Sequence, residues 1–118
     1  MPMRAVRGAV SADADTPAAI AHAVTTLLDA LLERNGLALA DVASAIFTVT
    51  PDVTSLRPPT AARAAGWGAV PMLAVAEAPT VEQDPPHCIR VLLHVHREGD
   101  GLLPVYLGAA RALRPDLG

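Results

Sequence analysis

Aromatic residues are scarce in this sequence: they make up 3% of its 118 residues, whereas hydrophobic residues make up 52%. The interior must therefore be built from alanine, valine, leucine and isoleucine rather than from rings. A chain of this length forms a single core, so we expect one domain over residues 1–118. The few aromatic positions, Phe47, Trp67 and Tyr106, then become individually informative.

Cysteine, positive charge and long apolar runs are also in short supply. A lone Cys88 cannot form an internal disulfide, which agrees with a reducing compartment. Nine basic and twelve acidic residues give a formal charge of −3 without a basic stripe, so no nucleic-acid partner is expected. No apolar run approaches the roughly 20 residues of a membrane span, and the first residues resemble a strand rather than a signal peptide. We therefore expect a cytoplasmic protein without a membrane partner.

Familiar catalytic motifs are missing too. The sequence has no Gly-x-Ser-x-Gly, no His-Glu-x-x-His and no glycine-rich phosphate loop after a strand. His94 and His96 project from one face of a predicted strand, but without a third ligand nearby a solvent-facing or interfacial position is favoured over a metal site. Cys88 is expected to be a small buried residue rather than a nucleophile, because no cation is obviously paired with it.

The first half of the chain predicts a strand followed by one long amphipathic helix. Met3–Val10 is the strand. Thr16 is the expected N-cap of the helix and Pro17 its first residue, while Asn35 and Gly36 suit its C-terminal end. Apolar residues recur between these ends at helical spacing, namely Ile20, Val24, Leu27, Leu28, Leu31 and Leu32.

The middle of the chain predicts two further strands. Asp41 is expected to cap a short helix before the β-branched strand Ala45–Thr50, which the turn Thr50-Pro51-Asp52 ends. Pro59–Ala65 favours a brief helix that the following glycine stops. Val70–Glu77 is then a strand that carries a carboxylate at its end.

The last third predicts a loop, a buried strand and two short elements. Pro79–Pro86 is a loop by composition, and Cys88–His96 is a strand that alternates between two faces. Leu102–Gly108 is expected to form a short helix and Ala109–Leu113 a last strand. One face of the buried strand holds Ile89, Val91, Leu93 and Val95, and the other holds Arg90, Leu92, His94 and His96.

These elements predict an α+β fold with one mixed sheet of about five strands, packed by a single long helix. One helix covers only one face of such a sheet. The other face then needs a partner, and we infer a homo-oligomer from that geometry.

Arginine occurs at strand positions where a side chain faces either the core or a ligand. Arg7 and Arg90 lie within predicted strands, and Arg114 lies beside Pro115. A guanidinium among aliphatic neighbours requires an anionic partner. For any single arginine, a local carboxylate at the surface or across an interface is a commoner partner than a ligand.

Several short sequence blocks follow one another in an informative order. The most specific are the opening Arg-x-x-Arg-Gly-Ala of residues 4–9 and the ending Leu-Arg-Pro-Asp-Leu of residues 113–117. Between them lie Thr50-Pro51-Asp52, Ala62-Arg63, Gly66-Trp67, Val70-Pro71, Cys88-Ile89-Arg90-Val91 and Val105-Tyr106-Leu107. In this order and spacing, the blocks resemble the AroH-class chorismate mutases over essentially the whole chain.

The resemblance implies a homotrimer that forms a pseudo-α/β-barrel, with active sites between adjacent subunits. It also implies that the protein rearranges chorismate to prephenate in phenylalanine and tyrosine biosynthesis. This Claisen rearrangement breaks a C–O bond and forms a C–C bond in one step, so it needs neither a nucleophile nor a cofactor. The enzyme has to hold a flexible dianion in a compact shape and stabilise the negative charge that grows on the ether oxygen.

The resemblance further assigns four catalytic residues. Arg90 would be the cation beside the breaking ether bond, and Glu77 would accept a hydrogen bond from the ring hydroxyl of the substrate. Arg7 would hold a carboxylate near the ether oxygen, and Tyr106 would donate a hydrogen bond to the side-chain carboxylate. Secondary contacts to the substrate would come from Arg63 and Arg114 at the pocket mouth and from Met72, Ala74 and Leu113 in its wall.

The sequence departs from the family at two positions near the expected pocket. Arg57 stands where the family usually has Phe, and Thr60 stands where it usually has Lys. We hypothesise that Arg57 replaces the charge lost at Thr60; alternatively, both lie on a mobile loop and contribute little. Ala74 falls where the family often has Cys. Two rival functions follow: a protein that binds a chorismate-like dianion without turnover, and an enzyme that acts on a related chorismate-derived dianion.

Overall fold

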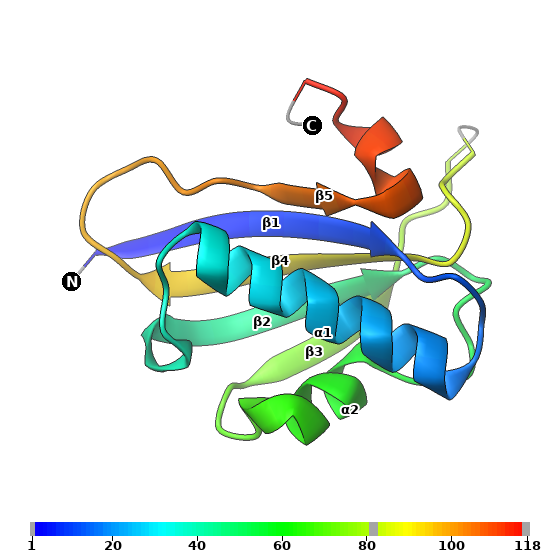
Figure 1. Cartoon of the computed structure of the whole chain (residues 1–118), viewed down its shortest axis with the longest axis horizontal. Helices are drawn as coiled ribbons and strands as arrows, with labels where there is room; N and C mark the ends of the chain where they lie inside the picture. The colour runs from blue at the N-terminus through cyan, green and yellow to red at the C-terminus, as the bar shows by residue number, and fades with distance from the viewer. Residues whose placement is uncertain (1, 81–82, 117–118) are drawn as a thin grey trace.

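A five-stranded sheet in the order β3-β2-β4-β1-β5 organises the chain (Figure 1). The computed structural model describes residues 2–80 and 83–116. β4 pairs antiparallel with both β1 and β2, whereas the edge strands β3 and β5 run parallel to their neighbours β2 and β1. The strands are β1 (Met3–Ser11), β2 (Val42–Val49), β3 (Met72–Ala76), β4 (Cys88–His96) and β5 (Val105–Leu107). The predicted α+β fold with one mixed sheet is therefore confirmed.

The long helix α1 (Pro17–Arg34) lies across one face of this sheet (Figure 1). At its start the backbone N–H of Ala19 donates to Oγ1 of Thr16 at 3.2 Å, which satisfies one of the free N–H groups of the first turn. Asn35 follows its last residue, and Gly36 adopts a positive φ of 59°. Both predicted helix ends are confirmed. In residues 2–80 and 83–116, no helix combines the length and the apolarity that a membrane span requires.

The hydrophobic core lies between α1 and alternate residues of the strands. On β4, Ile89 and Leu93 are fully buried, whereas Arg90 and Leu92 between them are only partly buried. Phe47 of β2 is the largest side chain that is fully buried in this core. The predicted alternation of β4 is confirmed, and it directs every second residue of the strand to the opposite face of the sheet.

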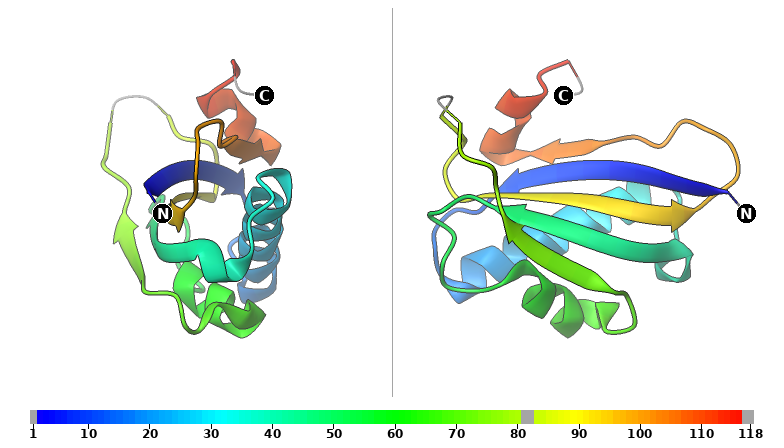
Figure 2. Two further views of the ribbon diagram at one scale, coloured as in Figure 1. Left: turned by 90° about the vertical axis from the view of Figure 1, so that its left-hand side faces the viewer. Right: turned by 180° about the vertical axis from the view of Figure 1, so that it is seen from behind.

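No helix in the described part of the chain crosses that opposite face (Figure 2). Seen from behind, the strands lie in front and α1 lies on their far side. The face is apolar at the β3 edge, where Leu73 is 65% and Val75 is 46% exposed. We call it the open face. The candidate site lies on it.

The two short elements predicted near the C-terminus are wrong, because strand and helix occur in the reverse order. The predicted helix Leu102–Gly108 contains β5, which gains its backbone hydrogen bonds by pairing with residues 8–10 of β1. Gly108 ends the strand with a φ of 60°. The predicted strand Ala109–Leu113 belongs to the 3₁₀ helix η3 (Gly108–Leu113), as its alanines favour helical turns.

Asp41 caps a short helix before β2, as predicted, but it does so from the last residue of that helix rather than from before its first. It ends the 3₁₀ turn η1 (Leu39–Asp41), where its carboxylate accepts the N–H of Ala38 at 2.9 Å. β2 begins at the next residue, Val42, rather than at Ala45.

The predicted helix at Pro59–Ala65 exists with shifted bounds. It is the helix α2 (Pro58–Ala62) followed by a π-helical turn η2 (Arg63–Trp67), in which Gly66 has a φ of 102°. The predicted loop Pro79–Pro86 has no helix or strand in its described part. Residues 81–82 of that loop, and 117–118 at the predicted C-terminal motif, lie outside the described residues.

Gly8 lets three elements approach one another closely. It faces the core from β1, opposite Val105 of β5 and beneath α1. A Cβ at this position would lie 2.9 Å from the carbonyl oxygen of Val105 and 3.0 Å and 3.1 Å from Cδ1 of Leu27 and Leu31. Since the oxygen belongs to the backbone, it cannot rotate away. This contact explains the glycine of the opening Arg-Gly-Ala.

We expect Gly8→Ala to lower the free energy of unfolding by about 1–3 kcal/mol, because it overpacks this junction. The measurement is urea unfolding followed by circular dichroism. Gly68→Ala is the matched control, since Gly68 has a φ of −60° and a Cβ added there would meet nothing within 4 Å. Equal stability of the two variants would contradict the close approach.

Candidate active site

A cavity of about 510 Å³ opens on the open face, a size suited to a small molecule. Its wall combines aliphatic side chains with charged ones. Six of the predicted site residues line it, namely Arg7, Glu77, Arg90, Tyr106, Leu113 and Arg114. The remaining lining residues are Gly8, Ile46, Thr48, Val91 and Leu92.

Strand register brings the predicted residues together. Ala9 of β1 pairs with Arg90 of β4 on one side and with Tyr106 of β5 on the other. Arg7 lies two residues before Ala9 on the same face and pairs with Leu92. Because Ala9 is small and fully buried, the larger side chains on either side of it border one space.

The guanidinium of Arg90 lies between two carboxylates. Its Nη1 is 2.7 Å from Oε1 of Glu77, and its Nη2 donates to Oδ1 of Asp84 at 2.9 Å. Nη1 is fully buried, yet its N–H bonds are not directed at the Glu77 oxygen, so this contact is an ion pair without a hydrogen bond. Burial alone would lower the pKa of Arg90, but the hydrogen bond to Asp84 and the nearby negative charges outweigh it and raise that pKa. The charge of Arg90 is therefore permanent.

Glu77 is held by β2. Its backbone N–H donates to the carbonyl of Val49 at 2.9 Å, which extends the pairing of β3 by one residue. The hydroxyl of Thr48 donates to Oε1 of Glu77 at 2.6 Å. The carboxylate therefore reaches the cavity in an orientation that two strands fix together.

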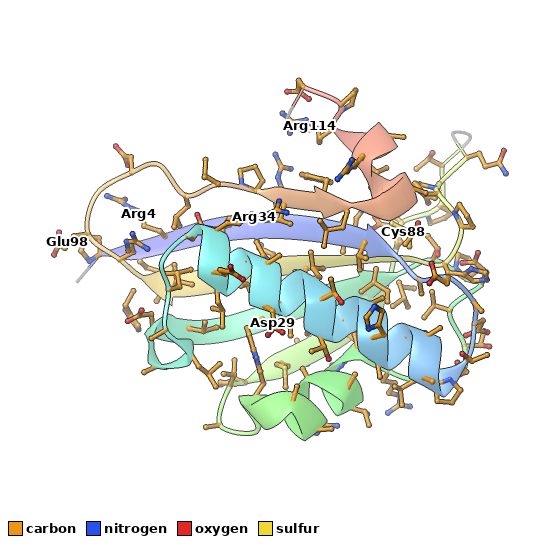
Figure 3. All side chains as sticks on the ribbon, viewed as in Figure 1. Arg4, Asp29, Arg34, Cys88, Glu98 and Arg114 are labelled. Carbon is orange, nitrogen blue, oxygen red and sulfur yellow. The ribbon has the colours of Figure 1, made fainter. Side chains whose placement is uncertain are left out.

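The other two cavity arginines differ in their pairing. Arg114 donates to both carboxylate oxygens of Asp116, at 3.1 Å and 2.9 Å, and these bonds lower the pKa of Asp116. Figure 3 shows Arg114 beyond η3, close to the C-terminal end. Arg7 is exposed and forms no ion pair with any residue of 2–80 or 83–116. Local pairing thus describes Arg114 and Arg90 but, within residues 2–80 and 83–116, it does not describe Arg7.

The remaining predicted site residues do not border this cavity in the single chain. Arg57 and Arg63 are exposed around α2, and Nη2 of Arg63 donates to Oγ1 of Thr60 at 3.3 Å. Thr60 borders a separate groove between α1 and α2. Met72 and Ala74 alternate with the open-face residues of β3 and pair with buried core residues of β2. Their assigned contacts with substrate stay predictions.

Sequence reasoning missed several residues that shape the site. Ile46 and Thr48 follow the alternation of β2, so the strand pattern contained the signal that places them beside Arg90. Asp84 carried no such signal, because it lies in a loop without periodicity. Its position beside Arg90 depends on how the chain returns from β3 to β4.

The other reactive side chains have ordinary structural roles. Cys88 is fully buried, and burial raises its pKa to about 11. Nδ1 of His94 lies 3.2 Å from the hydroxyl of Ser44 on the open face. Within residues 2–80 and 83–116, no three His, Cys, Asp or Glu side chains gather closely enough to hold a metal ion.

Comparisons with known proteins agree on one family. A family model described as chorismate mutase type I matches residues 3–117. The chain is 43% identical over 118 residues to chorismate mutase AroH of Thermus thermophilus, across 98% of this chain and 96% of that one. It is 33% identical over 120 residues to chorismate mutase AroH of Bacillus subtilis, across 99% and 94%. A solved chorismate mutase from Clostridium thermocellum matches with a TM-score of 0.87 at 34% identity, across 92% of this chain and 98% of that one.

The thiol of Cys88 should not react with an aromatic disulfide reagent at about pH 8 while the protein is folded. Its raised pKa leaves about one thousandth of it as the reactive thiolate, and the residue has no exposed surface. The absorbance of the released thiolate measures the reaction, and the protein unfolded in urea is the control that should react fully. Release of one equivalent within seconds from the folded chain would contradict the buried, protonated state.

Proposed function

The chain belongs to the type I chorismate mutase family, and we propose that its arginine-lined cavity is the site where chorismate rearranges to prephenate. The reaction isomerises one small dianion: a C–O bond breaks, a C–C bond forms, and no group is transferred to the protein. A site for it therefore needs cations and shape rather than a nucleophile. The cavity offers both, with Arg7, Arg90 and Arg114 set among aliphatic side chains.

The buried Nη1 of Arg90 is the observation that carries this proposal. Arg90 lines the cavity, and its Nη1 has no acceptor for its N–H bonds among the described residues. A donor held in this way meets the ether oxygen as negative charge develops on it, and does so without waiting for water to reorganise. Such a preorganised donor contributes about 3 kcal/mol or more to stabilising a transition state.

The other cavity residues position the substrate. Arg7, which lacks an ion-pair partner among the described residues, takes one carboxylate. Arg114 exchanges Asp116 for substrate at the cavity mouth, and the hydroxyl of Tyr106 donates to the side-chain carboxylate. Glu77 accepts the ring hydroxyl, since Thr48 already orients its carboxylate.

Replacement of Arg90 by citrulline, its neutral isostere, should lower kcat by about 100-fold or more because the shape is kept and the charge is lost. Ligation of a synthetic 88–118 peptide at Cys88 gives this variant. The measurements are the loss of chorismate absorbance and the formation of prephenate. The matched control is citrulline at Arg111, which is exposed and does not line the cavity.

Intact turnover in the citrulline-90 protein would contradict the proposed mechanism. A wild-type protein that binds chorismate to saturation without forming prephenate would instead support the rival function of a pure binder. A product other than prephenate would support the rival enzyme class.

We also propose that the protein works as a homotrimer whose subunits share each site. The apolar open face and the exposed edge strand β3 support a partner, because an uncovered edge of this kind invites association. The separation of Arg57, Thr60 and Arg63 from the cavity supports a shared site, since a second copy can supply them. On this proposal Arg57 supplies the charge that Thr60 lacks. The cytoplasmic location stays a prediction.

Leu73→Glu should reduce both the sedimentation coefficient and kcat/KM, because it places a charge on the face that the partner covers. Circular dichroism should be unchanged, since Leu73 is 65% exposed in the single chain. Leu103→Glu is the matched control, as Leu103 is 56% exposed in the loop before β5. A wild-type protein that sediments as a monomer, or a monomeric variant with full kcat/KM, would contradict the shared site.

A further inference from the structure

Asp84 contacts the same guanidinium as Glu77 but from a different side. Oδ1 of Asp84 lies 2.9 Å from Nη2 of Arg90, and Oε1 of Glu77 lies 2.7 Å from Nη1. Glu77 lines the cavity, whereas Asp84 does not. Asp84 therefore leaves the cavity free for substrate while it binds Nη2 of Arg90.

The two contacts also differ in what they fix. The Nη2 of Arg90 forms a true hydrogen bond to Asp84, whereas Nη1 only lies close to Glu77. Because a guanidinium is planar, anchoring Nη2 sets the direction of the N–H bonds on Nη1. The hydrogen bond from Nη2 to Asp84 therefore fixes the direction of the N–H bonds on Nη1, which have no acceptor among the described residues.

The segment that carries Asp84 is itself fastened at its C-terminal end. The backbone N–H of His87 donates to Oδ2 of Asp52 at 2.9 Å, and the hydroxyl of Ser11 donates to the carbonyl of Pro86 at 2.7 Å. Two prolines, at positions 85 and 86, directly follow Asp84 and restrict the backbone. The carboxylate thus has a stiff support, which a positioning group requires.

We propose that Asp84 is a positioning residue that aims Nη1 of Arg90 at the ether oxygen, an inference that rests on the proposed function. Asp84 is not among the residues that line the cavity. Its loss frees the guanidinium to rotate, so the donor is aligned in only a fraction of bound complexes. The loss then falls on the transition state, while Arg7 and Arg114 still bind the carboxylates of the ground state.

The opposite role for Asp84 would be that of a counter-ion that competes with substrate for Arg90. In that case its removal would lower KM and raise kcat/KM. The position of Asp84 outside the cavity argues against competition. The two roles predict changes of opposite sign, so one variant separates them.

The test compares Asp84→Ala, Asp84→Asn and the control Asp29→Ala by steady-state kinetics. Asp84→Ala should lower kcat roughly ten-fold, the loss typical of an outer support, with KM changed by less than about two-fold. Asp84→Asn should keep most of kcat, because its amide oxygen can still accept from Nη2. Asp29 is exposed on α1, across the sheet from the cavity, and its removal makes the same change in net charge (Figure 3).

A double-mutant comparison shows whether Asp84 acts through Arg90. In an Arg90→Gln background, Asp84→Ala should cause no further loss of kcat, because the group that it aims is gone. Calorimetry with a bicyclic ether dicarboxylate that mimics the transition state gives a readout besides turnover. Its affinity should fall roughly ten-fold in Asp84→Ala and stay unchanged in Asp29→Ala.

Unchanged or higher kcat in Asp84→Ala, or an additive loss in the Arg90→Gln background, would overturn the positioning role. Failure of the proposed function looks different, because the wild-type protein would then form no prephenate. Circular dichroism of Asp84→Asn and Asp84→Ala checks that both variants fold. If Asp84→Ala is unfolded, the kinetics and the crystal structure of Asp84→Asn decide. A kcat equal to wild type with a fully ordered Arg90 supports the proposal. An unchanged kcat with a disordered Arg90 overturns it.

Discussion

One partly buried cation, the guanidinium of Arg90, sets the constraints on the rest of the structure. It stands on β4 between Ile89 and Val91, both of them buried. Burial of even part of a charged group is unfavourable unless an opposite charge or a hydrogen bond compensates it. Glu77 and Asp84 supply the compensation from the end of β3 and from the loop before β4. The same two contacts tie an edge strand and a loop to the centre of the sheet.

The two faces of the sheet have different roles: one holds the hydrophobic core and the other holds the cavity. The face under α1 holds the closely packed core, and Gly8 brings β1, β5 and the helix together there. Asn35 at the end of α1 extends this packing, because its buried side chain donates to the carbonyls of Leu31 and Leu103 and accepts the N–H of Leu103. It thereby fixes the segment that leads into β5 and Tyr106. The open face is then free to carry the arginines.

Local signals made much of this structure predictable. The ends of α1 depend on Thr16, Asn35 and Gly36, which act within one helical turn, and the alternation of β4 follows from strand geometry. The segment 102–113 was misjudged because β5 owes its existence to pairing with β1, about 97 residues earlier in the case of Gly8 and Val105. Propensity alone does not contain that contact.

The site was predictable to the same extent and for the same reason. Arg7, Glu77, Arg90 and Tyr106 meet at one cavity because strand register aligns them, and the resemblance had assigned them together. The contact of Asp84 with Arg90 could not be predicted, because Asp84 lies in a loop whose sequence has no periodic pattern. The residues around α2 form a different case, since they do not line the cavity of the single chain and their predicted contacts with substrate stay predictions.

The central claim is that Nη1 of Arg90 is a preorganised hydrogen-bond donor to the ether oxygen, which becomes negative during the reaction. A crystal structure with the bicyclic ether dicarboxylate tests it most directly. The account predicts a hydrogen bond of about 2.7–3.0 Å from Nη1 of Arg90 to the ether oxygen, with Asp84 still on Nη2. An analogue that binds with its ether oxygen turned away from Arg90 would contradict it.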